Sequence, residues 1–122
     1  MVRVLIVDDE PDFVELIREF VSRHGYTPLL AYNGPEALCL LKEERPHIVL
    51  LDIRMPGMDG IEVLRKIREI DREVGVIMLT AVDDSEVGHR SFQLGAFDYL
   101  VKPLDFKYLE RVLWYKVATM TV

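Results

Sequence analysis

The chain has 122 residues, half of them hydrophobic and 30% of them charged, which is typical of one globular domain and unlike a disordered segment. Its 21 acidic residues outnumber its 15 Lys and Arg residues and give a formal net charge of −6, so direct binding to nucleic acid is not expected. The single cysteine, Cys39, excludes an internal disulfide and a multi-cysteine metal site, and it favours a reducing compartment.

The first half of the chain predicts two strands that alternate with two helices. Residues 2–7 form a β-branched run typical of a strand, and residues 13–24 carry apolar side chains at helical spacing. A second, weaker strand is expected at 27–31, because a proline interrupts its run. A helix at 33–44 follows; Asn33 is suited to cap it, with an acidic residue three positions later at capping-box spacing.

The second half of the chain continues this alternation with three more strands and three more helices. In chain order these elements are expected at 48–51, 61–70, 74–81, 83–94, 97–101 and 104–120. The longest apolar-rich stretch, 74–82, is far shorter than the ~20 residues of a membrane-spanning helix, and the N-terminus lacks the pattern of a signal peptide. We therefore expect a cytoplasmic protein that does not contact a membrane.

The order of these elements predicts the fold class. The central strands are continuously apolar instead of alternating, which indicates a parallel sheet with helices on both faces. Right-handed crossover connections then leave the doubly wound α/β sheet as the simplest topology. No internal repeat or flexible linker interrupts the pattern, so we expect residues 1–122 to form a single domain.

Polar side chains stand where four of the five expected strands end. They are Asp8 and Asp9 after the first strand, Asp52 after the third, Thr80 at the end of the fourth and Lys102 after the fifth. Each of them has an ordinary explanation when taken singly, such as a turn residue or an acid at a helix start. Sites in open parallel sheets form beyond the carboxyl ends of the strands, however, so we expect these five side chains to converge at one edge.

Such a cluster suits phosphoryl chemistry. Neighbouring carboxylates repel one another, and their pKa values rise unless positive charge lies among them. Lys102 can supply one charge, and Mg²⁺ can supply more because it binds carboxylate and carbonyl oxygens while keeping several waters. A metal and an ammonium group screen a phosphoryl group, to which a hydroxyl such as that of Thr80 can donate a hydrogen bond. Asp52 is then a plausible nucleophile, because aspartates form acyl phosphates.

Four motifs carry a resemblance to a known family. In order, they are "VLIVDDEP" (4–11), "LLDIRMPGMDG" (50–60), "MLTA" (78–81) and "FDYLVKP" (97–103). With these motifs the chain resembles, over essentially its whole length, the receiver domain of bacterial two-component response regulators. The resemblance implies a flavodoxin-like, five-stranded parallel sheet of order 2-1-3-4-5 with helices on both faces.

The resemblance also implies a role for each residue of the cluster. Asp52 is similar to the phosphoacceptor, which becomes an aspartyl phosphate. The implied ligands of Mg²⁺ (or Mn²⁺) are Asp8, Asp9, Asp52 and the backbone carbonyl of Arg54. Thr80 and Lys102 resemble the residues that contact the phosphoryl group, and Tyr99 resembles the aromatic residue that switches with the threonine. A cis peptide bond is implied between Lys102 and Pro103.

What such a domain does follows from the resemblance as well. It would accept a phosphoryl group from a sensor histidine kinase or phosphotransfer protein and change the surface formed by 83–94, 97–101 and 104–120. It would not be an enzyme beyond its own phosphotransfer and slow autodephosphorylation. The sequence leaves open whether the receiver stands alone or was excised from a longer regulator with an effector domain, and whether phosphorylation produces a homodimer.

Two further features bear on regulation and partners. Arg54 and Val82 flank the approach to the acceptor, where a bulky cation and an apolar side chain would restrict water, so we predict a long-lived phosphoform. Trp114, Tyr108 and Tyr115 lie off the apolar stripe of the last helix. They either pack at the edges of that helix or form a face for a partner or dimer, since aromatic residues are enriched in interface hot spots.

Two alternative functions remain. The first is a Mg²⁺-dependent phosphatase with an aspartyl nucleophile, which usually needs a second acid two residues after the nucleophile, where this chain has Arg54. The second is a receiver-like module that binds partners without being phosphorylated, and the presence of all five polar residues argues against it. Nucleotide binding is not expected, because the glycine-rich phosphate loops are absent from the sequence.

Overall fold

The computed structural model describes residues 1–81 and 83–120, in which strands and helices alternate along the chain. The strands are β1 (Arg3–Val7), β2 (Thr27–Ala31), β3 (Ile48–Asp52), β4 (Gly75–Thr80) and β5 (Asp98–Val101). The helices are α1 (Pro11–Arg23), α2 (Gly34–Glu44), α3 (Gly60–Ile70), α4 (Ser85–Gln93) and α5 (Phe106–Thr119). None of the helices in the described residues is both long enough and apolar enough to span a membrane.

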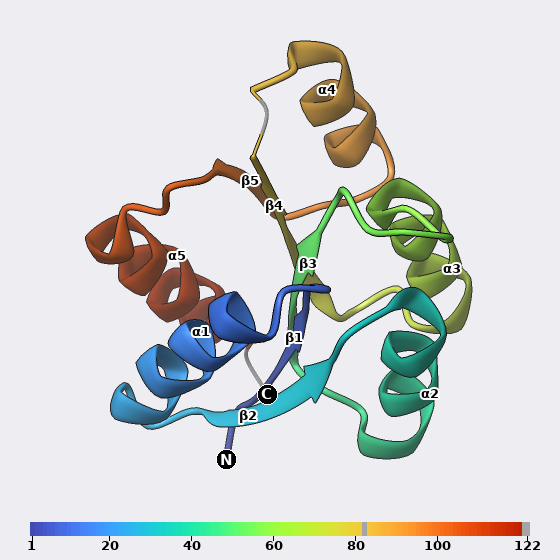
Figure 1. Cartoon of the computed structure of the whole chain (residues 1–122). Coiled ribbons are helices and arrows are strands. Elements are labelled where there is room, and N and C mark those ends of the chain that lie inside the picture. Colours follow the sequence, from blue (N-terminus) through green and yellow to red (C-terminus); the bar gives the residue numbers. More distant parts are fainter. Residues whose placement is uncertain (82, 121–122) are drawn as a thin grey trace.

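The five strands form one parallel sheet in the order β2-β1-β3-β4-β5, which confirms the predicted topology. Helices α1 and α5 cover one face of the sheet, and α2 and α3 cover the other, with α4 farther out beside β4 and β5 (Figure 1). Alternate strand residues point to opposite faces. Leu5 and Val49 therefore pack under α2 and α3, whereas Ile6 and Leu50 pack under α1 and α5.

The central strands are buried on both faces, as their continuous apolar runs predict. Every residue of β3 and β4 is buried, including the polar residues that end them, Asp52 and Thr80. The outer strands β2 and β5 are only partly buried. Pro28 lies in β2 at the edge of the sheet, where a missing backbone N–H group is tolerated.

Helices α4 and α5 begin later than predicted, because an acidic side chain caps each of them. The side chain of Asp84 accepts hydrogen bonds from the backbone N–H groups of the following turn, so α4 begins at Ser85 instead of residue 83. Asp105 caps α5 in the same way, and that helix begins at Phe106 instead of residue 104. An N-cap residue lies outside the helix it stabilises, so a start placed at or before the capping acid comes too early.

The predicted cap of α2 is present with one difference. The Asn33 side chain accepts a hydrogen bond of 2.9 Å from the backbone N–H of Glu36, as expected. The Glu36 carboxylate, however, accepts its hydrogen bond from the backbone N–H of Tyr32, also at 2.9 Å, instead of from that of Asn33. The reciprocal bond therefore closes one residue earlier than in a standard capping box.

Candidate functional site

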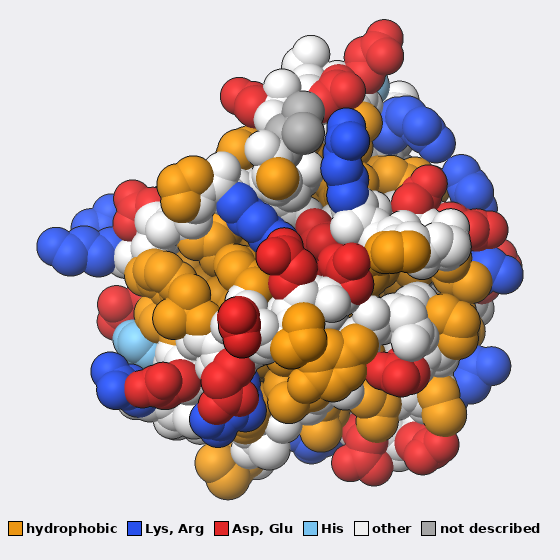
Figure 2. Space-filling view, in the orientation of Figure 1, with side chains coloured by type: hydrophobic (Ala, Val, Ile, Leu, Met, Phe, Trp, Pro, Cys, Tyr) orange, Lys and Arg blue, Asp and Glu red, His pale blue; other side chains and the backbone are white. Residues whose placement is uncertain are grey.

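Three carboxylates meet where β1 and β3 end. Asp8, Asp9 and Asp52 each offer an oxygen atom, and these atoms lie within 4.8 Å of one another. Asp8 is fully buried and Asp52 is 4% exposed, whereas Asp9 is exposed. Acidic side chains gather near the centre of the space-filling view with a basic side chain beside them (Figure 2). The structure therefore brings together the three acids that the sequence placed at two separate strand ends.

Lys102 joins this cluster from the end of β5. Its Nζ atom donates a hydrogen bond of 2.8 Å to Oδ2 of Asp8 and lies 3.6 Å from Oδ1 of Asp52. The same ammonium group lies 4.0 Å from the centre of the Phe13 ring on α1, a favourable cation–π distance. The peptide bond between Lys102 and Pro103 is cis, as predicted.

Asp8 is held in place from two sides. Its Oδ1 atom accepts a hydrogen bond of 2.9 Å from the backbone N–H of Glu10, while Oδ2 accepts the bond from Lys102. Its own backbone N–H donates to the carbonyl of Ala31 on β2 at 3.2 Å. A fully buried carboxylate is stable only when its oxygens have such partners, so these bonds explain how the site tolerates a second acid close to Asp52.

The electrostatics of the cluster act most strongly on Asp52. Burial, followed by the neighbouring charge of Asp8, raises the pKa of Asp52 to about 6. The positive charge of Lys102 and a hydrogen bond from the backbone of Arg54 oppose that rise in pKa. The carboxylate is therefore mostly ionised at neutral pH, but it carries an unrelieved charge that a cation would stabilise.

Thr80 and Tyr99 lie on the neighbouring strands. Thr80 is 2% exposed at the end of β4, and its backbone carbonyl accepts a hydrogen bond of 2.7 Å from the N–H of Lys102. Tyr99 on β5 is half-buried, and its ring lies against Gly88 of α4. Its hydroxyl lies 3.4 Å from the backbone nitrogen and 3.3 Å from the carbonyl oxygen of Asp84. Tyr99 thus connects β5 to the N-cap of α4.

Gly60 is a supporting residue whose role the sequence did not reveal. A Cβ atom at this position would lie 2.4 Å from the carbonyl oxygen of Asp52 and 2.6 Å from the Cα of Ile53. The backbone N–H of Gly60 also donates a hydrogen bond of 2.7 Å to the carbonyl of Ile53. The start of α3 therefore packs directly on the residue that carries the central carboxylate, and only glycine fits there.

The side chain of Arg54 lies outside the cluster, although its backbone forms a hydrogen bond with Asp52. Arg54 is exposed in the loop after β3, and its side chain lines a groove between that loop, α3 and α4. Val82, which was expected to flank the acceptor, lies outside the described residues.

The three aromatic residues of α5 do not form one face. The Tyr108 hydroxyl donates a hydrogen bond of 2.9 Å to Asp98 on β5. Tyr115 packs near Phe97, with ring centres 6.1 Å apart. Trp114 is 67% exposed and lines a separate groove together with His24 and Tyr26, which follow α1.

Comparisons with known proteins identify the family of this chain. Residues 4–113 match the family described as the response regulator receiver domain. The chain is 41% identical over 103 residues to sporulation initiation phosphotransferase F of Bacillus subtilis (strain 168). This match covers 84% of this chain and 83% of that protein. It is 36% identical over 110 residues to the transcriptional regulatory protein ZraR of Salmonella typhimurium; the match covers 90% of this chain but only 25% of ZraR, so the chain spans about a quarter of that relative.

A solved structure supports the fold. A two-component response regulator from Clostridium difficile superposes with a TM-score of 0.95, covering 100% of both chains at 24% sequence identity. The fold is therefore shared with that response regulator. The chain belongs to the response regulator receiver domain family, the phospho-accepting modules of two-component phosphorelay signalling, which are signalling domains and not enzymes.

Proposed function

We propose that residues 1–122 form one receiver domain in which Asp52 accepts a phosphoryl group from a phosphohistidine on a sensor histidine kinase or phosphotransfer protein. One observation carries this assignment. The Asp52 carboxylate is buried, lies beside two other acids and has the Lys102 ammonium 3.6 Å away. Burial raises the pKa of Asp52 to about 6 at this carboxyl edge of the sheet.

The transfer itself needs an ionised and oriented carboxylate. One oxygen of Asp52 forms a bond to phosphorus while the bond from phosphorus to the imidazole nitrogen breaks, and the electron pair of that bond stays on the imidazole. With a pKa of about 6, Asp52 is mainly ionised at neutral pH and ready for this attack. Lys102 is close enough to pair with a phosphoryl oxygen once the group is on Asp52.

The residues present fit a hard divalent cation. Three carboxylate oxygens within 4.8 Å of one another are the kind of ligand that Mg²⁺ or Mn²⁺ takes, together with water. Asp8, Asp9, Asp52 and the backbone carbonyl of Arg54 would hold the ion. When bound, the cation supplies charge neutralisation for the carboxylates and for the phosphoryl oxygens.

We further propose that Thr80 and Tyr99 convert phosphorylation into a change of surface. In the active arrangement the Thr80 hydroxyl donates a hydrogen bond to the phosphoryl group, and Tyr99 moves into the space that Thr80 leaves. The contact that Tyr99 makes with the backbone of Asp84 supports this route, because it joins the switch residue to the start of α4. Phosphorylation would thereby shift the populations of two arrangements of α4, β5 and α5.

Because the three aromatic residues of α5 do not form one face, they define two candidate surfaces for partners. Tyr108 contacts Asp98 of β5, and Tyr115 packs near Phe97 just before that strand, so both are candidates for a phosphorylation-dependent homodimer or for an effector domain. Trp114 belongs to the side shared with α1 and is proposed as a separate contact. Sedimentation with and without a phosphoryl mimic would separate them: Tyr115→Ala should abolish a phosphorylation-dependent dimer, and Trp114→Ala should leave it intact.

Phosphorylation can be tested by intact mass. After incubation with acetyl phosphate and Mg²⁺, the protein should gain one phosphoryl group, and Asp52→Asn should abolish that gain. Asp12→Asn is the matched control, since Asp12 is an exposed acid in the first turn of α1 and outside the cluster, and it should retain the gain. An equal gain in Asp52→Asn would place the acceptor elsewhere and refute the assignment.

A further inference from the structure

An open groove of about 760 Å³ lies between the loop after β3, α3 and α4. Three apolar side chains that are less than one-tenth exposed, Ile53, Met55 and Ile61, form its base. One wall is α4, a helix in which only Gly88 and Ser91 are buried. Because so little of α4 is buried, this wall can adjust its position at a small cost in packing energy.

Three arginines from three different elements line the same groove. Arg54 comes from the loop after β3, Arg65 from α3 and Arg90 from α4, and all three are exposed. Within the described part of the chain, none of their guanidinium groups forms a hydrogen bond or ion pair, although Glu62 and Glu69 are within one turn of Arg65. Basic side chains lie over α3 and α4 along the upper right of the space-filling view (Figure 2).

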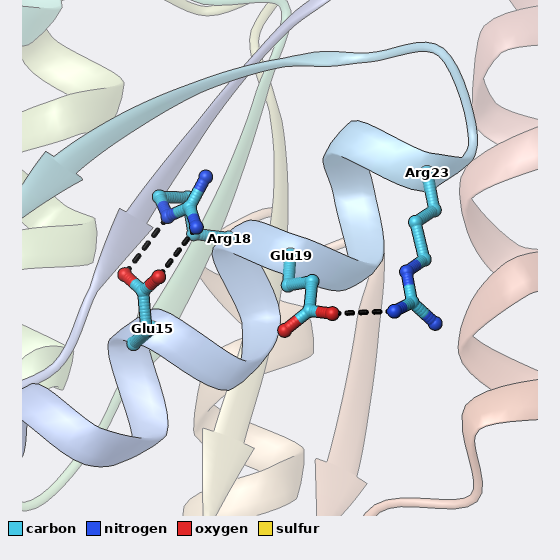
Figure 3. A network of polar contacts seen from close by, with 4 residues as sticks. All are labelled: Glu15, Arg18, Glu19 and Arg23. Carbon is cyan, nitrogen blue, oxygen red and sulfur yellow. Dashed lines mark hydrogen bonds and ion pairs between the residues drawn. The ribbon is translucent and has the colours of Figure 1, made fainter.

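The arginines of α1 show the opposite arrangement. Arg18 pairs with Glu15 and Arg23 pairs with Glu19, each within one turn of the helix (Figure 3). Glutamates therefore neutralise the positive charge on α1 locally. On α3 and α4 the guanidinium groups remain available in a protein of net charge −6, so they can bind negative groups of a partner.

A second groove, of about 570 Å³, continues this surface. Arg65 lines both grooves, and Arg72 adds another exposed cation. Arg68 also lines the second groove, but it is occupied, because its guanidinium donates hydrogen bonds of 2.7 Å to the carbonyls of Val74 and Gly95. Arg65 and Arg72 thus extend the available positive charge beyond the first groove, with the exposed acid Glu69 between them in the sequence.

We propose that the groove between α3 and α4 docks an acidic polypeptide segment of a partner protein. Its carboxylates would pair with Arg54, Arg65 and Arg90, for which the planar guanidinium group is well suited, and an apolar side chain would contact the base. A nucleic acid fits less well, since Asp59 and Glu62 line the same groove and would repel a continuous phosphate backbone. The carboxylates of a peptide are separate side-chain groups, so each can pair with one arginine. This inference does not depend on phosphorylation of Asp52.

The test uses a fluorescein-labelled peptide of about 12 residues in which Glu and Leu alternate, with binding measured by fluorescence anisotropy at low salt. Binding should weaken at least about tenfold in the double variant R65E/R90E. The matched control is K107E/R111E, which removes as many cations from the groove beside Trp114 and should keep the affinity. A peptide in which Ser replaces Leu should bind more weakly, because it cannot contact the apolar base.

Three kinds of outcome would contradict the proposal, and each indicates a different explanation for the groove. Equal losses in the two double variants, or equal binding of the Leu and Ser peptides, would show general charge attraction and overturn the proposal. Tighter binding of a single-stranded oligonucleotide of the same charge would assign the groove to nucleic acid instead. Self-association that R65E/R90E abolishes in sedimentation would assign it to a second copy. If circular dichroism shows that R65E/R90E is unfolded, R65Q/R90Q takes its place with the same expected loss.

Discussion

The centre of the sheet and the α4 region are built in opposite ways. Each residue of β3 is buried, and the strand carries Asp52 at its end. Helix α4 has a strong N-cap at Asp84, yet only two of its small residues are buried, and Phe92 is 50% exposed. The centre therefore fixes the position of the acidic cluster, whereas α4 is held by few apolar contacts.

This difference explains how one small domain can both hold a reactive group and change shape. A nucleophile needs a fixed geometry, which close packing provides. A switching element needs two arrangements that differ by only a few kcal/mol, which sparse packing permits. The contact of Tyr99 with the backbone of Asp84 lies at the boundary between the two regions.

The largest expected effect on the free energy of unfolding is at the centre of the sheet. Leu50 is fully buried in β3 beneath α1 and α5, so Leu50→Ala should lower the free energy of unfolding by about 2–5 kcal/mol through lost burial and a residual cavity. Urea unfolding followed by circular dichroism measures this change. Phe92→Ala on α4 is the matched control and should cost less than about 1 kcal/mol. Similar losses for the two variants would contradict the contrast between the regions.

Gly60 near the centre and Gly88 on α4 allow the two regions to be compared by the effect of an added Cβ atom on stability. In Gly60→Ala the new Cβ would lie 2.4 Å from the Asp52 carbonyl oxygen, so the backbone must move and stability should fall by about 1–3 kcal/mol. In Gly88→Ala the new Cβ would lie 3.5 Å from the Tyr99 ring, an ordinary contact. Because alanine favours a helix over glycine, Gly88→Ala should raise stability by about 0.5–1 kcal/mol. Thermal unfolding compares the two variants, and loss of stability in both would refute the distinction.

The two regions were not equally predictable from sequence. Continuous apolar strands and polar residues at strand ends are local patterns, so the sheet and the positions of Asp8, Asp52 and Lys102 could be anticipated. The partner that Lys102 contacts most closely could not be anticipated, because its 2.8 Å bond to Asp8 depends on how β5 approaches β1 across two intervening strands. The close approach of Gly60 to Asp52 likewise arises only when α3 packs against β3.

Surface features were the least predictable. The sequence left open whether the three aromatics of α5 pack at the helix edges or form a face for a partner. A helix turns by about 100° per residue, so Trp114 lines a groove with residues that follow α1, whereas its neighbour Tyr115 packs near Phe97. The groove between α3 and α4 collects arginines from three separate elements, and no run of basic residues in the sequence signals it.

The charge of the acidic cluster should make stability depend on pH in the metal-free protein. Asp52 has a pKa of about 6 in the folded state against an ordinary value of 3.8, so the folded state binds its proton more tightly than the unfolded state does. The contribution of this group to stability is therefore full below about pH 4 and is lost as the pH rises through about 6. In the presence of EDTA, Asp52→Asn should be more stable than the wild type by roughly 1–3 kcal/mol at neutral pH.

Urea unfolding at several pH values measures this effect. The difference between the wild type and Asp52→Asn should shrink as the pH falls toward 4, because Asp52 in the folded state becomes protonated as the pH drops through its pKa of about 6. Asp59→Asn, at an exposed helix cap, does not remove a buried charge and should not raise stability at neutral pH. A constant difference between the wild type and Asp52→Asn at all pH values would show that burial of this charge is not its cause.

The smallest expected effect lies at the boundary between the regions. The Tyr99 hydroxyl meets the backbone of Asp84 at 3.3 and 3.4 Å, distances that indicate weak hydrogen bonds. Tyr99→Phe keeps the ring against Gly88 and removes these weak bonds of the hydroxyl, so global stability should change by less than about 0.5 kcal/mol. Amide hydrogen exchange should nevertheless become faster in α4 and stay unchanged in β3, because α4 opens locally without unfolding the centre. Faster exchange in β3 as well would mean that α4 and the centre unfold as one unit, and the two regions would then not be energetically distinct.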